Sequence, residues 1–583
     1  GFGQRFFQHV LKSWGVTNIA GSSYAQCRGA RDAGFALTFG AGVGSPEPTD
    51  IRNTQCLVLI GSHLGENMHN TQVQEMAEAI GRGVPIIVVD PRHSVAASKA
   101  KYWLPVKPGT DMALLLAWMN LLVGEGRYDR DFVAKHGHGF DKFAAAIKGY
   151  TPEWAAEQCG VSAEVIRAAA REFAAHRPAA IVHPGRRVNW YGDDTQRSRA
   201  IALLNALLGS YGRAGGLYVS QTMKVAPFAL PPYPKSDKPR ADGADGSEFP
   251  FADEGITTSI RKATLTGKPY PIKGWVVYSA NLMQALPNER ETIEAIDKLD
   301  LLVVCDTVPG EMAGYADVVL PDTTFLERHD ELLVGYGRTG WAALRQPVVA
   351  PPHDQKPAWW IAKQLADKLG IGACMPFKDM EEYLAKRVTA AGLDWERLKA
   401  EGVIMGEHKP ITVEEGLELS FDTPSGKVEF WSDQLAAKGF DAVPKYTKHP
   451  EAPADHFRLI TGRSPVHTFS RTQTNPLLHD MVSDNEVWVH AATAARLGLK
   501  HRDWVRLKNQ DGATSNRVRV KATQRIREDT VYMVYGFGHK APMLKRANGR
   551  GASAAALNTR YATDPLMGAT SIHANFVQLV KEA

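Results

Sequence analysis

Apolar runs, turn residues and amphipathic stretches divide much of the chain into strand–helix–strand units. Residues 55–90 read as an apolar strand, a turn rich in Gly and Asn, an amphipathic helix and a second strand that ends at Asp90. Residues 274–306 repeat this order, and their second strand ends at Asp306. Both segments are predicted to be βαβ units with parallel strands.

The two units belong to a longer internal repeat. The segment AKYWLP begins at Ala100 and ADVVLP at Ala316, so these segments and the two aspartates share one offset of 216 residues. In an open parallel sheet, ligands bind beyond the carboxyl ends of the strands, where an acid can hydrogen-bond a nucleotide. We therefore expect two nucleotide sites. The alternative is that either aspartate only caps a helix.

The turns of these units argue against a nicotinamide dinucleotide. Neither GSHLGEN nor YSANLMQ has the G-x-G-x-x-G pattern, and the second contains no glycine. Side chains that can bond phosphate or the edge of a heterocycle are present instead: Ser62, His63, Asn67, Ser279 and Asn281.

Between the units, a loop after Pro184-Gly185 becomes a helix. Its basic residues are Arg186, Arg187, Arg197 and Arg199. Arg186 lies on this rigid loop, and that position suits a guanidinium that binds an anionic substrate. Arg197 and Arg199 either attract an anion at the helix start or form a solvated face paired with the neighbouring aspartates.

The pattern changes near residue 456, where a β-rich C-terminal domain is predicted to begin. Period-two alternation on both sides of Asp511-Gly512 predicts a hairpin in a compact barrel. The loop 461–476 suits a polyanionic cofactor, with a solvated surface loop as the alternative. Its polar residues include Arg463, His467, Arg471 and Asn475.

Composition narrows the class of protein. The 583 residues are 44% hydrophobic and 22% charged, and no run of about 18 apolar residues could span a bilayer. The formal charge of +5 is small and scattered, which makes nucleic acid an unexpected partner. The first residues carry neither Met nor a leader pattern, which leaves the compartment open.

Five cysteines are present without any CxxC pair, so zinc-knuckle and iron–sulfur ligand sets are missing. Cys27 alone has a polar setting, between Arg28 and Arg31. Nearby arginines lower the pKa of a thiol and favour the thiolate, which attacks electrophiles or binds metals. Packing is the alternative, and it is the plain interpretation of Cys56 and Cys305 in their apolar runs.

Seven segments, in this order, resemble the molybdopterin oxidoreductases of the dimethyl-sulfoxide-reductase superfamily. They are IGSHLGENMH, VVDPR, VKPGTDMALLLAW, HPGRRVNWYGDDTQRSRAIALLNALLG, VCDTVPGEMAGYADVVLPDTTFLER, TGRSPVHTFSRTQTNP and DPLMGATSIHANFVQLV. They cover almost the entire chain. The sequences of the segments YAQCRGARD, HPGRRVNWYG and GFGH are most similar to those of the polysulfide, thiosulfate and arsenate reductase branch. This branch includes quinone-linked sulfite dehydrogenases.

This resemblance implies an α/β fold with two Rossmann-like dinucleotide-binding domains related by the repeat, plus a C-terminal six-stranded double-psi-type β-barrel. Residues 1–150 would form the first Rossmann-like domain with the metal-ligand loop, joined by part of 330–455. Residues 151–349 would form the second, 350–455 a connecting α/β segment and 456–583 the barrel. The four-cysteine segment that holds a [4Fe–4S] cluster in this branch is absent from this sequence.

The resemblance also implies a cofactor of molybdenum, with tungsten as the alternative, and two molybdopterin guanine dinucleotides. Cys27 would be the protein ligand to the metal, and Cys27 and Arg186 the catalytic residues. Asp90 and Asp306 would bind the guanine ends. The full set of expected cofactor-binding residues is Gly61, Ser62, His63, Glu66, Asn67, Asp90, Pro91, Arg92, Gly109, Asp111, Gly185, Ser279, Asn281, Asp306, Thr307, Asp322, Gly462, Arg463, His467, Phe469, Arg471, Asn475 and Asn558.

The implied function is that of a catalytic subunit acting on an inorganic sulfur oxyanion, by sulfite oxidation to sulfate or by thiosulfate or polysulfide reduction. Its partners would be an iron–sulfur subunit and a quinone-linked membrane anchor, so that it is membrane-associated only through them. Sulfite is the first expectation. The alternatives are an arsenate reductase or arsenite oxidase, and a cofactor-free scaffold subunit of a respiratory complex.

Overall fold

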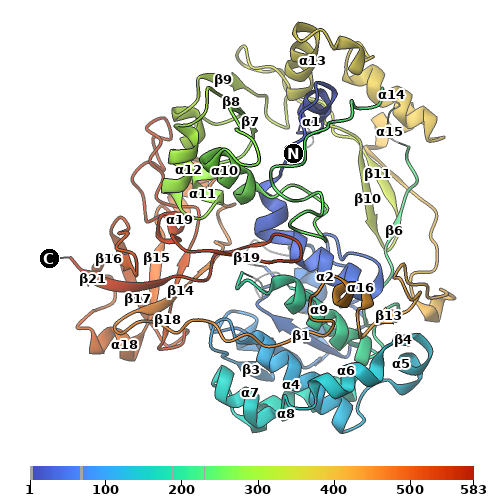
Figure 1. The fold of residues 1–583 in the computed structure, drawn as a ribbon, viewed down its shortest axis with the longest axis vertical. Helices are drawn as coiled ribbons and strands as arrows, with labels where there is room; N and C mark the ends of the chain where they lie inside the picture. Colours follow the sequence, from blue (N-terminus) through green and yellow to red (C-terminus); the bar gives the residue numbers. More distant parts are fainter. Residues whose placement is uncertain (1–3, 66–69, 186–189, 227, 229, 583) are drawn as a thin grey trace.

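The computed structural model describes residues 4–65, 70–185, 190–226, 228 and 230–582 (Figure 1). Glu66, Asn67 and Arg186 therefore lie outside the described residues. Figure 1 shows a first α/β region at the bottom, a second at the upper left, a mixed region at the upper right and a barrel near the C-terminus.

The first sheet is parallel and buried. Its strand order is β3 (Tyr102–Leu104), β2 (Ile86–Val89), β1 (Cys56–Ile60) and β5 (Ala180–Val182). Every residue of β1 and β2 is buried, as expected for a parallel sheet covered on both faces. Because β5 pairs with β1, the first sheet extends past residue 150, and the predicted boundary there needs correction.

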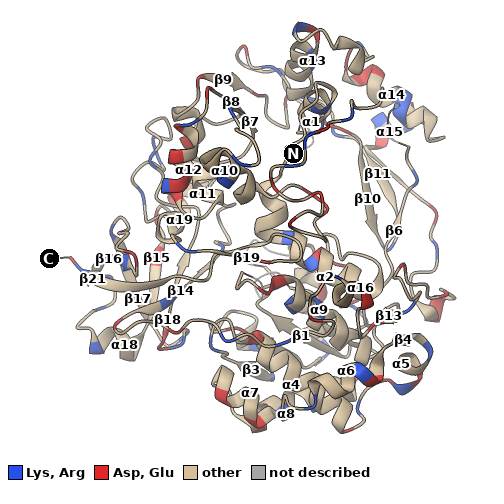
Figure 2. Ribbon diagram, in the orientation of Figure 1, with Lys and Arg blue, Asp and Glu red and all other residues tan. Residues whose placement is uncertain are grey.

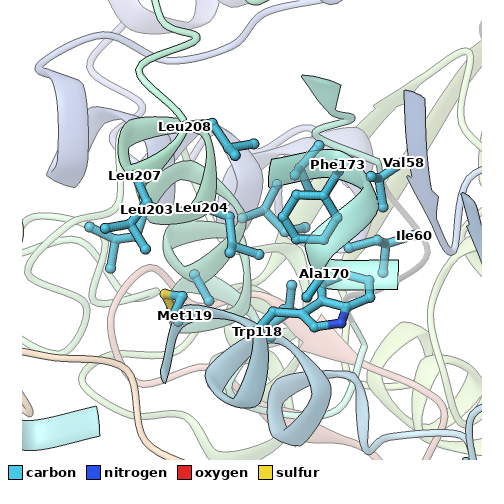
Figure 3. Close-up of a cluster of buried hydrophobic side chains, with 14 of the residues drawn as sticks. Val58, Ile60, Trp118, Met119, Ala170, Phe173, Leu203, Leu204, Leu207 and Leu208 are labelled. Carbon is cyan, nitrogen blue, oxygen red and sulfur yellow. The ribbon is translucent and has the colours of Figure 1, made fainter. Parts of the chain in front are cut away.

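Three long helices form the core of this region together with β1. They are α4 (Asp111–Gly124), α8 (Ala163–Ala175) and α9 (Asp194–Leu207). Figure 3 shows Trp118 of α4, Phe173 of α8 and Leu204 of α9 packed near Val58 and Ile60 of β1. Shorter helices complete the region: α3 (Val73–Gly81), α5 (Arg130–His136), α6 (Phe140–Ile147) and α7 (Pro152–Cys159).

A further helix, α2 (Gly29–Phe39), packs directly on α9. A methyl group at Gly34 would lie 2.7 Å from the backbone nitrogen of Arg199. Glycine at this position therefore allows the two helix backbones to approach closely. This contact fixes the segment that carries Cys27 against the first sheet's helical layer.

The second sheet repeats the first in register. Its order is β7 (Gly274–Tyr278), β8 (Leu301–Asp306) and β9 (Val318–Pro321), all parallel. Val89 lies opposite Leu104 in the first sheet and Cys305 lies opposite Leu320 in the second, with members of the two pairs 216 residues apart. A one-residue slip would turn each side chain to the other face, so the shared register confirms the internal repeat. Helices α10 (Thr257–Thr266), α11 (Leu282–Ala285) and α12 (Glu289–Ile296) belong to this region.

The segment predicted to connect the domains divides between two regions. Helices α13 (Ala358–Lys368), α14 (Met380–Ala390) and α15 (Trp395–Glu401) share a core with α1 (Gln4–Ser13). An antiparallel sheet of β6 (Gln221–Thr222), β10 (Leu333–Gly337), β11 (Trp341–Ala343) and β12 (Val403–Met405) lies beside them. Farther along the chain, β13 (Val428–Glu429) returns to pair with β4 (Gly137–His138) of the first region.

The C-terminal domain is a closed six-stranded barrel, which confirms the predicted fold class. Its order is β14 (Phe457–Gly462), β18 (Thr530–Val534), β15 (Glu486–His490), β17 (Val518–Thr523), β16 (Trp504–Asn509) and β21 (Phe576–Lys581). Strands β16 and β17 form the hairpin predicted around Asp511-Gly512. Figure 2 shows Lys and Arg interspersed with Asp and Glu along the ribbon.

The returning segment is held by a buried guanidinium. Arg199 of α9 is fully buried and donates to the backbone oxygens of Ala442 at 2.6 Å, Glu429 at 2.9 Å and Phe430 at 3.3 Å. Burial lowers the pKa of Arg199 to about 9, so the side chain remains charged at neutral pH. Arg199 therefore stabilises the fold and does not bind an external anion.

Arg199→Met should loosen this segment, because a side chain of similar length leaves three buried carbonyls unpaired. We expect the free energy of local opening to fall by about 2–4 kcal/mol, measured as faster amide hydrogen exchange within residues 428–442. Exchange in the barrel should not change. Arg290→Met, which removes an exposed ion pair with Glu294, is the control, and equal exchange in both variants would contradict the role of Arg199.

Candidate functional site

Cys27 lies on a single π-helical turn, Tyr24–Arg28, that leads directly into α2. Its side chain is half-buried, whereas Cys56, Cys159, Cys305 and Cys374 are all buried. π-Helical turns are rare and occur frequently at functional sites. Cys27 is therefore the most exposed of the five cysteines, and its role as a metal ligand stays a prediction.

The arginines beside Cys27 are paired with carboxylates. Arg28 lies 3.1 Å from Asp32 and also contacts Glu254. Arg31 is fully buried and pairs with Glu47. The positive charges of Arg28 and Arg31 are thus neutralised by carboxylates one helical turn away or farther along the chain. The expectation of a net positive setting around Cys27 was therefore wrong.

Both flanks of the predicted substrate loop are bonded to the Cys27 segment. Arg31 donates to the backbone oxygen of Gly185 at 3.5 Å. The indole N–H of Trp190 donates to the backbone oxygen of Gln26 at 2.9 Å. The contacts of Arg186, between these flanks, stay a prediction because that residue is not described.

Asp194 organises the far flank of this loop. Its Oδ1 accepts the backbone N–H groups of Trp190 at 2.7 Å and Tyr191 at 2.9 Å, and its Oδ2 accepts the hydroxyl of Ser571 at 2.7 Å. Asp194 is fully buried. Burial, and secondarily the nearby Asp564, raise the pKa of Asp194 to about 7.

A cavity lies between the carboxyl end of the first sheet and the barrel. Eight predicted cofactor-binding residues line it: Gly61, His63, Asp90, Pro91, Arg92, Asp111, Gly462 and Arg463. The polar lining residues that sequence reasoning missed are Tyr191, Thr461, Tyr532 and His573. Tyr191, Thr461 and His573 lie in segments that carry the family resemblance, and that signal could have found them. Tyr532 lies outside those segments, in a strand of the predicted barrel.

Within this cavity, Asp90 accepts the backbone N–H of Arg92 at 2.8 Å. The guanidinium carbon of Arg92 lies 4.4 Å from the ring centre of Tyr532 and 5.4 Å from that of Trp488. Cation–π contacts of this kind fix the orientation of a guanidinium. The barrel therefore positions a cation above the first strand-end aspartate.

Arg197 holds the loop before α4. It is fully buried and bonds the backbone oxygen of Gly109 at 2.6 Å, Asp111 at 3.3 Å and Asp193. Burial raises the pKa of Asp111 to about 6, although the charge of Arg197 opposes the shift. Arg197 was expected either to attract an anion or to pair with aspartates on a solvated face. The structure shows pairing with aspartates, but the pairs are buried.

The turns after β1 and β7 have the same backbone conformation. Gly61 has φ 51° and Ser279 has φ 48°. The Gly61 N–H donates to Val89 at 3.0 Å, and the Ser279 N–H donates to Cys305 at 2.9 Å. A positive φ strains a serine by about 1–3 kcal/mol, and such residues cluster at ligand sites.

The barrel also reaches the second strand-end aspartate. Asp306 accepts the backbone N–H of Thr307 at 2.7 Å, and burial raises its pKa. Arg471 donates to the backbone oxygen of Ser279 at 3.4 Å. In the same loop the guanidinium of Arg463 lies 4.3 Å from the ring centre of Phe469, which is 40% exposed.

Several predicted cofactor residues are engaged by the protein instead. Both oxygens of Asp322 accept protein donors, and both ring nitrogens of His467 bond within 461–482. Asn475 caps α17 (Pro476–Met481). The backbone of Asn558 accepts the N–H of Asn288 at 2.8 Å, where the barrel meets the second region. For Asp322, His467 and Asn475 these bonds give the side chains a structural role, and their contact with a cofactor stays a prediction.

Buried polar atoms at both turns lack a protein partner. The hydroxyl of Ser62 and the side-chain oxygen of Asn281 are shielded from solvent without a hydrogen-bond partner among the described residues. Each such atom costs about 1–3 kcal/mol unless a ligand bonds it. The two turns therefore fit polar ligands such as pterin dinucleotides.

Among the described residues, Cys27 is not part of a cluster of several metal-binding side chains. Over the described ranges, no three or more His, Cys, Asp or Glu side chains gather in a way that could hold a metal ion. A metal at Cys27 would therefore take its other ligands from a cofactor. Thiolate is a soft ligand suited to such a site.

Comparisons with known proteins agree with this arrangement. The family description Molybdopterin oxidoreductase matches residues 6–368, and Molydopterin dinucleotide binding domain matches residues 457–576. The thiosulfate reductase molybdopterin-containing subunit PhsA of Salmonella typhimurium is 35% identical over 94% of this chain and 76% of its own. Acetylene hydratase of Syntrophotalea acetylenica is 27% identical over 80% of this chain and 69% of its own. The structure of acetylene hydratase from Pelobacter acetylenicus aligns with a TM-score of 0.80 at 23% identity, covering 100% of this chain and 84% of that one.

Asp194→Asn should stabilise the protein at pH 8 and leave its stability almost unchanged near pH 3, below both the folded and the unfolded pKa. The folded pKa of about 7 lies above the ordinary 3.8, so the folded state binds more protons and wild-type stability falls as pH rises between these values. The amide imitates the neutral acid. We expect a melting temperature about 3 °C higher at pH 8. Asp193→Asn, which removes a partner of Arg197, should instead destabilise at both pH values; a lower melting temperature for Asp194→Asn at pH 8 would contradict the assignment.

Proposed function

Because the chain belongs to the molybdopterin oxidoreductase family, we propose that it is the catalytic subunit of an enzyme that reduces thiosulfate. The observation that carries this proposal is the 35% identity, over 94% of the chain, to a thiosulfate reductase subunit. Sulfite oxidation was the first expectation from the sequence. We rank thiosulfate ahead of sulfite because of the 35% identity to this relative.

The proposed site holds one metal, molybdenum or tungsten, and two molybdopterin guanine dinucleotides. When bound, this cofactor supplies a metal that accepts and donates an electron pair. Cys27 is the single protein ligand to the metal. Asp90 and Asp306 bind the guanine ends at the two sheets, and Arg92 and Arg463 balance the charge of the phosphates on the barrel side.

Arg186 is proposed to bind the oxygens of the substrate. Thiosulfate takes up two electrons and two protons, its sulfur–sulfur bond breaks, and hydrogensulfite and hydrogensulfide leave. Negative charge grows on the departing sulfite, where a guanidinium stabilises it through charge-assisted hydrogen bonds. The bonds of Arg31 and Trp190 to the two flanks of the loop support this placement.

Electrons are proposed to arrive through an iron–sulfur subunit and a quinone-linked membrane anchor. The name of the Salmonella relative describes that protein as one subunit. In the part of the chain that the structure describes, no helix has the length and apolarity to span a bilayer. Membrane association would therefore depend on the partners.

Cys27→Ser should abolish most turnover while leaving the pterins bound. We expect about one metal and two pterins per wild-type chain, by metal mass spectrometry and pterin release. The variant should keep the pterins, because both sheets and the barrel bind them, but its activity should fall at least about 100-fold since serine is a harder ligand.

Cys374→Ser, at a buried cysteine outside the proposed site, is the matched control and should retain activity. Full activity in Cys27→Ser would remove Cys27 from the metal. A folded wild-type protein from a cofactor-competent host with neither metal nor pterin would favour the scaffold alternative.

A dye-linked assay should rank thiosulfate first among candidate substrates. Sulfite, polysulfide, tetrathionate, arsenate and arsenite test the other members of the branch, whose oxyanions a guanidinium would also bind. We expect kcat/KM for thiosulfate to exceed that of the others by at least about 10-fold. A higher value for sulfite or for an arsenic oxyanion would replace the proposed substrate and leave the cofactor assignment intact.

A further inference from the structure

One stretch of the barrel holds the chain's excess of positive charge. Residues 496–527 contain ten Lys or Arg and two Asp or Glu, a net charge of +8, whereas the whole chain has a formal charge of +5. The other residues therefore sum to −3. The stretch includes β16 and β17, which pair with one another. Charge that is scattered over most of the sequence is thus concentrated on two neighbouring strands.

The alternation of these strands directs the charges to the outer face of the barrel. Val505, Leu507, Val518 and Val520 belong to the barrel core and are 0% exposed. The residues between them stand on the opposite face of the sheet. We call these six residues the basic face: Trp504, Arg506, Lys508, Arg517, Arg519 and Lys521. Figure 1 draws β16 and β17 on the side of the barrel away from the first α/β region.

Two guanidinium groups lie against the ring of Trp504. The guanidinium carbon of Arg517 is 4.6 Å from the ring centre, and that of Arg519 is 4.3 Å from it. Strand pairing places Trp504 directly opposite Arg519. Cation–π contacts fix the orientation of both guanidinium groups. An anion that approaches this ring therefore meets two positioned cations at once.

The basic face has few carboxylates to balance its charge. Among the described residues, Lys508, Arg517 and Arg519 form no ion pair with an acidic side chain, whereas the other two cations of the face each have one acidic neighbour, Glu582 or Glu486. Three of the five cations are thus left without an acidic partner from this chain. A surface of one sign attracts and orients molecules of the opposite sign.

Carboxylates of another protein suit this face better than a membrane or a nucleic acid does. A guanidinium is a planar fork that binds a carboxylate through two parallel hydrogen bonds. Aromatic side chains at membrane interfaces and on single-stranded nucleic acids need an exposed ring, but the ring of Trp504 is half-buried and contacted by two arginines. Trp and Arg are also enriched at the energetic centres of protein interfaces.

We propose that the basic face is a docking surface for an acidic segment of a partner protein, whose carboxylates bind Arg517 and Arg519. A second copy of this chain is not the proposed occupant, because Glu291 and Glu294 on the acidic helix α12 are already paired with arginines. The inference goes beyond the proposed function, since the face is part of the fold and does not contact the cofactor residues predicted from the sequence.

Arg517→Lys/Arg519→Lys tests whether carboxylates are bound through the two forks. The probe is a fluorescein-labelled peptide of alternating Glu and Asp, added to the purified full-length chain at low ionic strength and followed by fluorescence anisotropy. The Lys variant keeps the charge but loses both forks, so we expect the peptide to bind at least about 5-fold more weakly. Arg517→Gln/Arg519→Gln also loses the charge and should bind at least about 20-fold more weakly. The melting temperatures should stay near that of the wild type, because both side chains lie outside the core.

Lys273→Gln/Arg290→Gln is the matched control, because it removes two exposed cations outside the basic face and gives the same net charge as the Gln variant. It should bind the peptide with wild-type affinity. Equal affinity of the wild type and the Lys variant, or equal losses in the control and the Gln variant, would overturn the inference. The same proteins are mixed with vesicles that contain phosphatidylserine and with a single-stranded oligonucleotide. Binding of either one without binding of the peptide would replace the acidic protein by a membrane or a nucleic acid.

Discussion

In both parallel sheets the carboxyl ends of the strands face the barrel. The rest of the site depends on these two edges. The first edge and the end of β14 enclose the cavity that contains Asp90 and Gly462. At the second edge, barrel residues bond Ser279 and Glu311. The strand ends, and the turns with positive φ that follow them, expose backbone N–H and C=O groups. Polar ligands can therefore bond the main chain at these edges.

The two edges have the same backbone and different side chains. Gly61 and Ser279 share a left-handed conformation, but only the serine is strained by it. At the first edge the barrel contributes Tyr532, which stacks on Arg92. At the second it contributes His539, which bonds a carboxylate. The duplicated fold therefore offers two strand edges with similar turns and distinct polarity.

Cys27 gains its setting from contacts distant in sequence. The π-helical turn re-aims the chain just before α2, and the close approach at Gly34 fixes that helix on α9. Arg31 and Trp190 then bond the turn and α2 to the two flanks of residues 186–189. The Cys27 segment and the two flanks of residues 186–189 are thus joined through interior hydrogen bonds, whose strength in a low-dielectric environment favours one fixed geometry.

The sequence by itself determined the repeat, the barrel hairpin and part of the lining of the first cavity, because alternation, strand ends and turn residues are local signals. Asp90, Asp306 and Cys27 were identifiable in this way. The tertiary structure decided which side chains bond one another, because local signals do not specify partners far along the chain. Arg197 and Arg199 proved to be buried braces, and Asp322 and His467 are bonded within the protein, since partners come from segments far along the chain. The pairing of His539 with Glu311, 228 residues apart, exists only because the barrel folds back over the second sheet, where burial makes each unpaired atom costly.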